Sequence, residues 1–327
     1  QTAPQPTVKY LSADDSNSQA SPVIVRKLIR EGKYVNAGVV RTYEFLNYYS
    51  FDYPPAVEEE VRIVPQMRLL STADSAAPAD APTAADADNA PDGSEVGKAP
   101  ARTYSLQVAL RSRDKVFTRL PPLNITFLLD TSGSMAGPSL DLAKQFLLGF
   151  TGRLRPGSAN RPADTFSLVT CNRRTLVMAE ERTVNDRTRQ FIEEAVLPNL
   201  TANDVTDLEE GLVKAYEIAS RSYDYRYLNR VVLISDGAAN AGETAVEVIA
   251  RHAEDTDRQG IYLAGVGVGE GFNDSLMDTV TDKGRGAYLF LDSEEEIGRV
   301  LSKDRFIANF DVAVKDVRLK MVIDRKS

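Results

Sequence analysis

A carboxylate and two hydroxyls follow an apolar run in the segment NITFLLDTSGSM, residues 124–135. Asp130 ends the run, and Ser132 and Ser134 follow at alternate positions. Oxygen side chains at this spacing could hold a metal ion, bind a phosphate or supply a nucleophile. Serines that precede a helix often serve only as N-caps, so this segment alone leaves a purely structural role open.

Two other segments carry oxygen side chains at comparable positions. The segment TANDVTDLEEGL, residues 201–212, places Thr206 just before a run with helical periodicity. The segment VVLISDGAAN, residues 231–240, is an apolar run that ends at Asp236. Both residues become relevant to the same chemistry if the fold brings their segments next to Asp130.

The elements that must position these residues are apolar strands alternating with amphipathic helices, from residue 122 to residue 304. Strands are predicted at ITFLLD, TFSLVTC, TLVMAE, RVVLISD, IYLAGVGV and AYLFLD, with helices between most of them, including one over 243–259. This alternation predicts an α/β fold with a doubly wound, mostly parallel sheet. Because ligands of such sheets bind beyond the carboxyl ends of the strands, Asp130, Thr206 and Asp236 are expected at one edge.

Two carboxylates and three hydroxyls would then converge, and all of them are hard oxygen donors. Mg²⁺ prefers octahedral oxygen coordination and keeps several waters, so this donor set suits it. Mn²⁺ fits the same donors, and Ca²⁺ is a further option. Five protein ligands at most leave a position of an octahedral ion open for another ligand.

The α/β unit is predicted to be inserted in a smaller flanking domain that contains β-strands and N-terminal helices. Its middle part, rich in Ala, Asp and Pro, contains almost no large apolar residue and is predicted to be a disordered loop. The last part alternates apolar and polar residues and is predicted to form strands that join those before Pro121. The predicted segments are a flexible tether (1–19), two helices and a first strand (20–70), the loop (71–100), a second strand (101–121), the α/β domain (122–304) and the C-terminal strands (305–327).

Composition excludes several classes of protein. The net charge of −8 argues against nucleic acid as a partner. One cysteine and one histidine exclude an internal disulfide, a site with two histidines and a four-cysteine zinc site. No apolar stretch approaches the roughly 18–20 residues of a transmembrane helix. A lipid anchor upstream of Gln1 stays open.

Asp130-x-Ser132-x-Ser134, followed by Thr206 and then Asp236, resembles the metal-ion-dependent adhesion site of von Willebrand factor A domains. In that family the five residues lie on three loops in this chain order. The resemblance implies that they hold Mg²⁺ and that an Asp or Glu of a partner protein completes the coordination shell. It also implies a function in adhesion or protein interaction, without enzymatic activity.

The chain resembles more particularly the bacterial YfbK-type envelope subgroup of this family. The resemblance rests on FLNYYSFDYPP, residues 45–55, and on the strands expected after the A domain. It implies a location in the bacterial cell envelope or at the surface, in the periplasm or outer membrane. The long loop at 71–100 is not expected of the subgroup.

Two other functions stay open. One is an intracellular assembly factor that works with an ATPase, as some A domains do. The other is a Mg²⁺-dependent phosphatase with Asp130 as an aspartyl-phosphate nucleophile, Asp236 on the metal and Thr170 on the phosphate. Such phosphatases usually carry a second acid where this chain has Ser132, and this alternative gives Thr206 no role.

Three further features are interpreted as structural. His252, the only available base for a serine nucleophile, sits at helical spacing from apolar neighbours. Cys171 follows an apolar strand without a histidine in pattern. The run GVGVGEG at 265–271 does not keep the G-x-G-x-x-G spacing of a dinucleotide loop.

Overall fold

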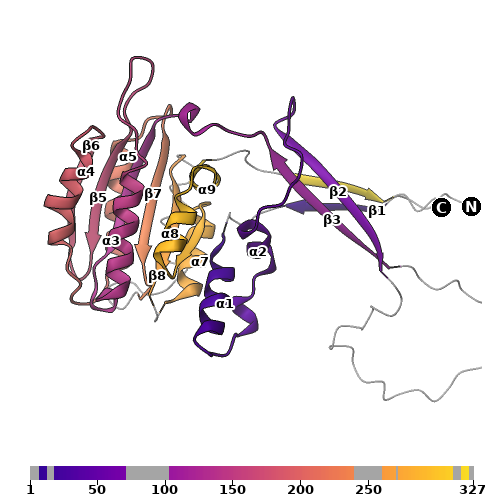
Figure 1. The fold of residues 1–327 in the computed structure, drawn as a ribbon, viewed down its shortest axis with the longest axis horizontal. Helices are drawn as coiled ribbons and strands as arrows, with labels where there is room; N and C mark the ends of the chain where they lie inside the picture. Colours follow the sequence, from indigo (N-terminus) through magenta and orange to yellow (C-terminus); the bar gives the residue numbers. More distant parts are fainter. Residues whose placement is uncertain are drawn as a thin grey trace, which may run out of the picture. The chain divides into compact units, whose positions relative to one another are not determined.

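The computed structural model describes residues 7–12, 18–70, 103–238, 260–269, 272–311 and 318–323. Within this part of the chain, six strands form one sheet (Figure 1). The strand order is β6-β5-β4-β7-β8-β9, and only β6 runs antiparallel to its neighbour. The α/β class and the mostly parallel sheet predicted from the sequence are confirmed. The strands are β4 (Leu123–Asp130), β5 (Thr165–Cys171), β6 (Thr175–Thr183), β7 (Leu228–Ser235), β8 (Tyr262–Val268) and β9 (Tyr288–Leu291).

The inner strands are apolar because helices cover both faces of the sheet. Every residue of β4 is buried; Leu123, Ile125, Phe127 and Leu129 belong to one hydrophobic cluster, and Leu128 belongs to the cluster on the other face. The order of the strands reverses between β4 and β7, which lie side by side in parallel register, Leu129 opposite Ile234. Such a reversal opens a crevice beyond the carboxyl ends of the two strands.

One face of the sheet carries what we call the aromatic layer, formed by α3 (Pro138–Thr151), α8 (Glu294–Val300) and α9 (Lys303–Phe310). Phe150 is its centre: its ring lies 5.0 Å from Phe127 of β4, 5.0 Å from Phe306 and 4.8 Å from Phe310, measured between centroids. Each buried aromatic side chain contributes about 2–3 kcal/mol of transfer free energy. Helical turns at Thr188–Phe191 (α4) and Ile192–Val196 extend this layer.

The prediction of strands immediately after residue 305 is wrong, because α9 extends to Phe310. Phe306 and Phe310 are four residues apart and therefore lie on one side of a helix, where both pack against Phe150. The C-terminal part of the predicted flanking domain thus begins with a helix of the aromatic layer. Residues 312–317, also predicted to be strand, lie outside the described residues.

The opposite face carries what we call the ion-pair layer, formed by α1 (Ala20–Arg30), α5 (Leu208–Arg221) and α7 (Asp274–Lys283), with α2 (Thr42–Tyr48) beside α1. The predicted N-terminal helix is α1, followed by Gly32 with φ +66°. The second of the two helices predicted within residues 20–70 is α2, and a separate 3₁₀ turn at Ala37–Val39 precedes it. The helix predicted over 243–259 lies outside the described residues.

Buried charges attach the N-terminal helices to this layer. The Arg41 guanidinium donates to Asp274 Oδ1 at 2.9 Å and also pairs with Glu44, whose side chain is fully buried. The Ser21 N–H donates to Glu44 at 2.6 Å, and the Gln19 N–H donates to the Tyr288 carbonyl of β9 at 2.7 Å. Helices that precede the α/β domain in sequence therefore cover part of its sheet.

Residues 51–114 form a separate compact unit. Its β2 (Val61–Leu70) and β3 (Thr103–Ser112) are the two strands predicted before and after the loop, and they pair antiparallel without a register shift. Pro65 lies opposite Val108 in a sheet that has only these two strands among the described residues, so its missing N–H is tolerated at an edge. The loop predicted over 71–100 lies outside the described residues.

A further antiparallel pair joins β1 (Thr7–Ser12) to β10 (Arg318–Ile323). The sequence predicts residues 7–12 to be part of the flexible tether, whereas the structure makes them a strand. Within the described residues β10 pairs with β1, and not with the strands of the 51–114 unit as predicted. No described helix combines the length and the apolar character that crossing a membrane requires.

Candidate metal centre

Asp130 is fixed at the end of β4 by hydrogen bonds to both of its carboxylate oxygens. The Ser132 N–H donates to Oδ1 at 2.9 Å, and the Ser235 hydroxyl donates to Oδ2 at 2.6 Å. The side chain is fully buried. Because β4 and β7 are adjacent and parallel, the end of one strand supplies the carboxylate and the end of the other supplies the hydroxyl that orients it.

Ser132 and Ser134 lie on the turn that follows β4, with their hydroxyl oxygens 3.0 Å apart. Ser132 is buried and Ser134 is exposed. Neither caps α3, whose N-cap position is Gly137 without a side-chain hydrogen bond. The purely capping role that the sequence left open is therefore not the role of these serines.

Gly133 allows the turn to approach the loop that carries Thr206. Its N–H donates to the Asp204 carbonyl at 2.8 Å, and a Cβ on Gly133 would lie 3.2 Å from that oxygen. The Asn203 N–H donates in the other direction, to the Thr131 carbonyl, at 2.9 Å. These two bonds join the turn and the loop as a short two-sided bridge.

Thr206 is fully buried in that loop, immediately before α5. The next residue, Asp207, accepts from the Glu210 N–H at 3.0 Å as the N-cap of α5. The Asp207 N–H donates to the Asn172 carbonyl at 3.0 Å. Thr206 is thus held on one side by the two backbone bonds to the turn that carries Ser132 and Ser134, and on the other side by the capped helix α5.

Asp236 follows β7 directly and is 3% exposed. Its Oδ1 accepts from the Ala238 N–H at 3.0 Å, and its carbonyl accepts from the Asn273 N–H at 2.8 Å. Gly237 adopts φ +75°, a conformation that favours glycine, so the chain can turn sharply after the carboxylate.

The electrostatics of the site favour a cation. Burial raises the pKa of Asp130 to about 6, the hydrogen bonds from Ser235 and Ser132 oppose this, and the charge of Asp236 adds to it. Neither carboxylate forms an ion pair with a described arginine or lysine. A positive charge between them would relieve both the repulsion and the cost of burial.

The donor set consists of oxygen only. Among the described residues no group of three or more His, Cys, Asp or Glu side chains is placed to hold a metal. A site here would combine two carboxylates with hydroxyls, which suits a hard cation such as Mg²⁺ and not a thiolate- or imidazole-bound metal.

Sequence reasoning missed Ser235, although it directly precedes Asp236 and its hydroxyl binds Asp130. The signal was a hydroxyl residue at the end of an otherwise apolar strand. Cys171 is fully buried, and burial raises the pKa of its thiol well above the usual value, which agrees with its structural interpretation. His252 lies outside the described residues.

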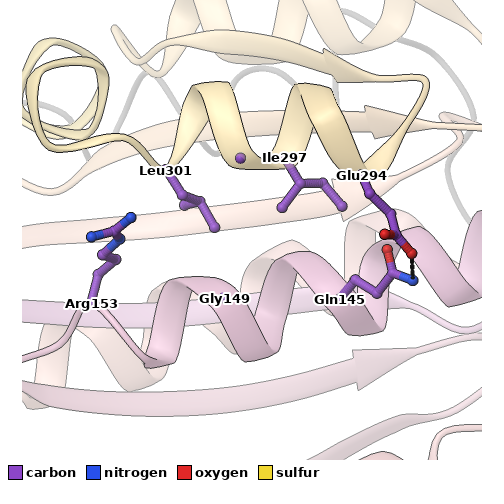
Figure 2. Close-up of a pocket in the computed structure, with 7 residues that line it drawn as sticks. Gln145, Gly149, Arg153, Glu294, Ile297 and Leu301 are labelled. Carbon is purple, nitrogen blue, oxygen red and sulfur yellow. Dashed lines mark hydrogen bonds between the residues drawn. The ribbon is translucent and has the colours of Figure 1, made fainter.

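A groove of about 440 Å³ between α3 and α8 is separate from these residues (Figure 2). Gln145 donates to Glu294 at 2.7 Å at one end of it, and Arg153 lies at the other. Ile297 and Leu301 form its apolar wall. None of the five predicted metal ligands lines this groove.

Comparison with known proteins places the α/β domain in a family. The family model of the von Willebrand factor type A domain matches residues 124–303. The chain is 25% identical over 323 residues to the uncharacterized protein YfbK of Escherichia coli K12, a match that covers 98% of this chain and 51% of that protein. It is 24% identical over 170 residues to inter-alpha-trypsin inhibitor heavy chain H3 of Rattus norvegicus, covering 50% of this chain and 18% of that protein. The chain spans about half the length of YfbK and less of the other relative.

Solved structures of similar proteins are more distant. A von Willebrand factor type A protein from Catenulispora acidiphila is 16% identical with a TM-score of 0.46, covering 60% of this chain and 43% of that one. BatB from Bacteroides thetaiotaomicron is 18% identical with a TM-score of 0.45, covering 57% of this chain and 98% of that one.

Proposed function

The chain belongs to the von Willebrand factor type A domain family, and we propose that it is a metal-dependent protein-binding module and not an enzyme. The observation that carries the proposal is the pair of buried carboxylates, Asp130 and Asp236, at the ends of adjacent strands and without an ion pair among the described residues. The proposed metal ligands, some of them acting through water, are Asp130, Ser132, Ser134, Thr206 and Asp236.

Each part of the chain has a definite task in this proposal. Asp130 is oriented by Ser132 and Ser235, so its carboxylate does not have to reorganise when a cation binds. Thr206 is held between a bridged loop and a capped helix, which fixes its backbone relative to the turn that carries Ser132 and Ser134. A bound Mg²⁺ would supply positive charge and an open coordination position, which an Asp or Glu of a partner protein would fill. Mn²⁺ and Ca²⁺ are the alternatives that the same donors allow.

Metal binding tests the proposed ligands. Asp236→Ala and Thr206→Val should each weaken Mg²⁺ or Mn²⁺ binding about tenfold or more, because even outer-shell partners of a metal typically contribute that much. Asp141→Ala is the matched control: it removes an exposed carboxylate in the first turn of α3. Titration calorimetry measures the affinities, and circular dichroism checks the fold. Unchanged affinity in both site variants would contradict the proposed ligand set.

Partner binding tests the functional class. Capture of a partner protein from envelope extracts should require Mg²⁺ and should be lost in EDTA and in Thr206→Val, which changes no charge. A partner retained equally in EDTA would contradict metal-dependent binding. Release of phosphate from a generic phosphatase substrate, abolished by Asp130→Asn but not by Thr206→Val, would instead support the aspartyl-phosphate alternative.

The location of the protein is also a proposal. The relationship to YfbK, over nearly all of this chain, supports assignment to the bacterial cell envelope, as the subgroup implies. Fractionation of cells that express the complete gene product with a C-terminal tag tests it. Recovery in the cytoplasm together with an ATPase would favour the assembly-factor alternative.

A further inference from the structure

A second groove, of about 360 Å³, lies directly beside the proposed metal ligands. Its walls come from the connection between β5 and β6 and from the loop before Thr206. Thr131 lines it, and Thr131 is the residue between Asp130 and Ser132. A ligand that reaches the metal ligands therefore lies next to this groove. We call it the Arg174 groove.

Hydrogen bonds make the walls of the Arg174 groove one connected surface. Asn172 donates through its amide to the Asn203 side chain at 2.9 Å, which joins the β5–β6 connection to the loop. The Asn172 side-chain oxygen accepts from the Arg174 N–H, also at 2.9 Å, and so fixes the turn that carries Arg174. These hydrogen bonds hold the two walls of the groove together.

The two arginines of the groove differ in their partners. Arg173 donates through Nε to both carboxylate oxygens of Asp204, at 2.9 and 3.0 Å, so its charge is matched inside the groove. Asp204 has φ +64°, and its carbonyl accepts from Gly133, so this pair supports the bridge to the motif turn. Arg174 is exposed and forms no ion pair with a described acidic side chain. Both arginine charges act on the Asp204 carboxylate, and the three side chains together carry one net positive charge.

We propose that the Arg174 groove binds a second acidic side chain of the partner, close in sequence to the one on the metal. This inference rests on the proposed function, because the first carboxylate is needed to bring the second into reach. Arg174 provides a planar set of donors that matches a carboxylate. The net charge of −8 opposes long polyanions such as nucleic acid, whereas a short segment with two acids carries little charge to repel. The partner is thus a protein segment with two nearby acidic residues.

A peptide array provides the probe. Glycine-serine peptides carry one Asp, or one Asp with a second Asp at one to three positions on either side, and binding is measured in Mg²⁺ and in EDTA. The wild-type protein should prefer at least one two-acid spacing over the one-acid peptide by about two- to fivefold, the range of an exposed ion pair. The preference should shrink as salt is raised.

Variants separate the groove from the metal site. Arg174→Gln should remove the two-acid preference and leave the binding of the one-acid peptide unchanged, while Arg174→Lys should retain part of the preference. Arg187→Gln makes the same charge change at an exposed position outside the groove and should retain all of it.

The outcomes for the groove and for the metal site are distinct. Metal-dependent binding of the one-acid peptide without any two-acid preference, or an equal loss in Arg187→Gln, would overturn the groove proposal alone. Binding of no acidic peptide in Mg²⁺, or equal binding in EDTA, would overturn the proposed function as well.

Discussion

The two faces of the sheet are held by different physical forces. The aromatic layer packs Phe150 against four other rings, those of Phe127, Phe146, Phe306 and Phe310. The ion-pair layer has a core of mixed aliphatic and aromatic side chains, but its N-terminal helices are attached through buried charges centred on Arg41 and Glu44. Hydrophobic burial is non-directional, whereas a buried charge that loses its partner is strongly destabilising. The N-terminal helices should therefore be the more specifically placed part of the molecule.

The ion-pair layer is also connected to the candidate metal centre, through the residue that precedes α7. Asp274, which Arg41 holds, follows Asn273, and the Asn273 N–H binds the Asp236 carbonyl at 2.8 Å. The Tyr288 hydroxyl of β9 donates to the same Asp274 at 2.8 Å. Arg41, which lies outside the segment matched by the family model, thus supports the start of α7, beside a proposed metal ligand.

The largest effect should come from the centre of the aromatic layer. Phe150→Ala should lower the free energy of unfolding by about 3–5 kcal/mol, because it removes a fully buried ring and leaves a cavity. Phe272→Ala is the matched control on the other layer, where the ring is only partly buried and lies 4.8 Å from Phe290. Urea denaturation measures both. Equal losses would show that the two layers do not differ as described.

The next effect should come from Arg41. Arg41→Met should cost about 2–3 kcal/mol, because it leaves the Glu44 carboxylate buried without its cationic partner. The double variant Arg41→Met with Glu44→Gln should recover part of the loss, since the uncompensated charge is gone. Arg187→Met, at an exposed position, should change stability by less than about 0.5 kcal/mol. A double variant no more stable than Arg41→Met would argue that packing, and not charge, attaches these helices.

A smaller effect concerns pH. Burial raises the pKa of Asp278 from 3.8 to about 6, opposed by Arg41 and reinforced by Glu44, Asp274 and Asp282. The folded state therefore holds a proton that the unfolded chain releases, and this contribution to stability falls as pH rises from about 4 to about 6. Burial also raises the pKa of Glu44, although Arg41 opposes this, so it adds to the same slope.

Asp278→Asn should flatten that slope by about 1 kcal/mol over the interval, a figure reduced for partial solvent screening. Denaturation midpoints at several pH values, compared with those of Asp141→Asn, measure it. A slope as steep in Asp278→Asn as in the wild type would assign the pH dependence to other groups.

The smallest effect should come from a helix cap in the aromatic layer. The Ser293 hydroxyl accepts from the Glu296 N–H at 3.3 Å at the start of α8. Ser293→Ala should cost about 0.5 kcal/mol, the lower end of the range for a helix cap because this hydrogen bond is long, and Ser293→Gly only a few tenths. Thermal unfolding can resolve the difference. Alanine and glycine variants of equal stability would mean that this long hydrogen bond contributes little to the layer.

Much of the fold could be predicted because burial on both faces gives continuous apolar runs. The runs that become β4 and β7 were visible for this reason, and their ends predicted where Asp130 and Asp236 lie. The parallel sheet followed from the alternation of strands and helices. The role of these residues as metal ligands stays a proposal.

The rest depended on contacts between segments far apart in the chain. Nothing in local periodicity shows that the Ser235 hydroxyl meets Asp130, or that Gly133 meets Asp204. The segment around Phe306 and Phe310 is short and compatible with either strand or helix, and packing against Phe150 decides for helix. The attachment of α1 likewise rests on the backbone bond from Gln19 to Tyr288 of β9 and on the ion pair between Arg26 and Asp292, which no sequence pattern encodes.

The pairing of β1 with β10 has a consequence for mechanical load. Thr7 lies opposite Ile323, and every other described element lies between the two strands in sequence. Tension applied through the chain on both sides of this pair must open it before it pulls on any intervening element. In an antiparallel pair loaded from one end, the hydrogen bonds break one after another and not together. Under tension, this strand pair would therefore separate at low force, before the six-stranded sheet is loaded.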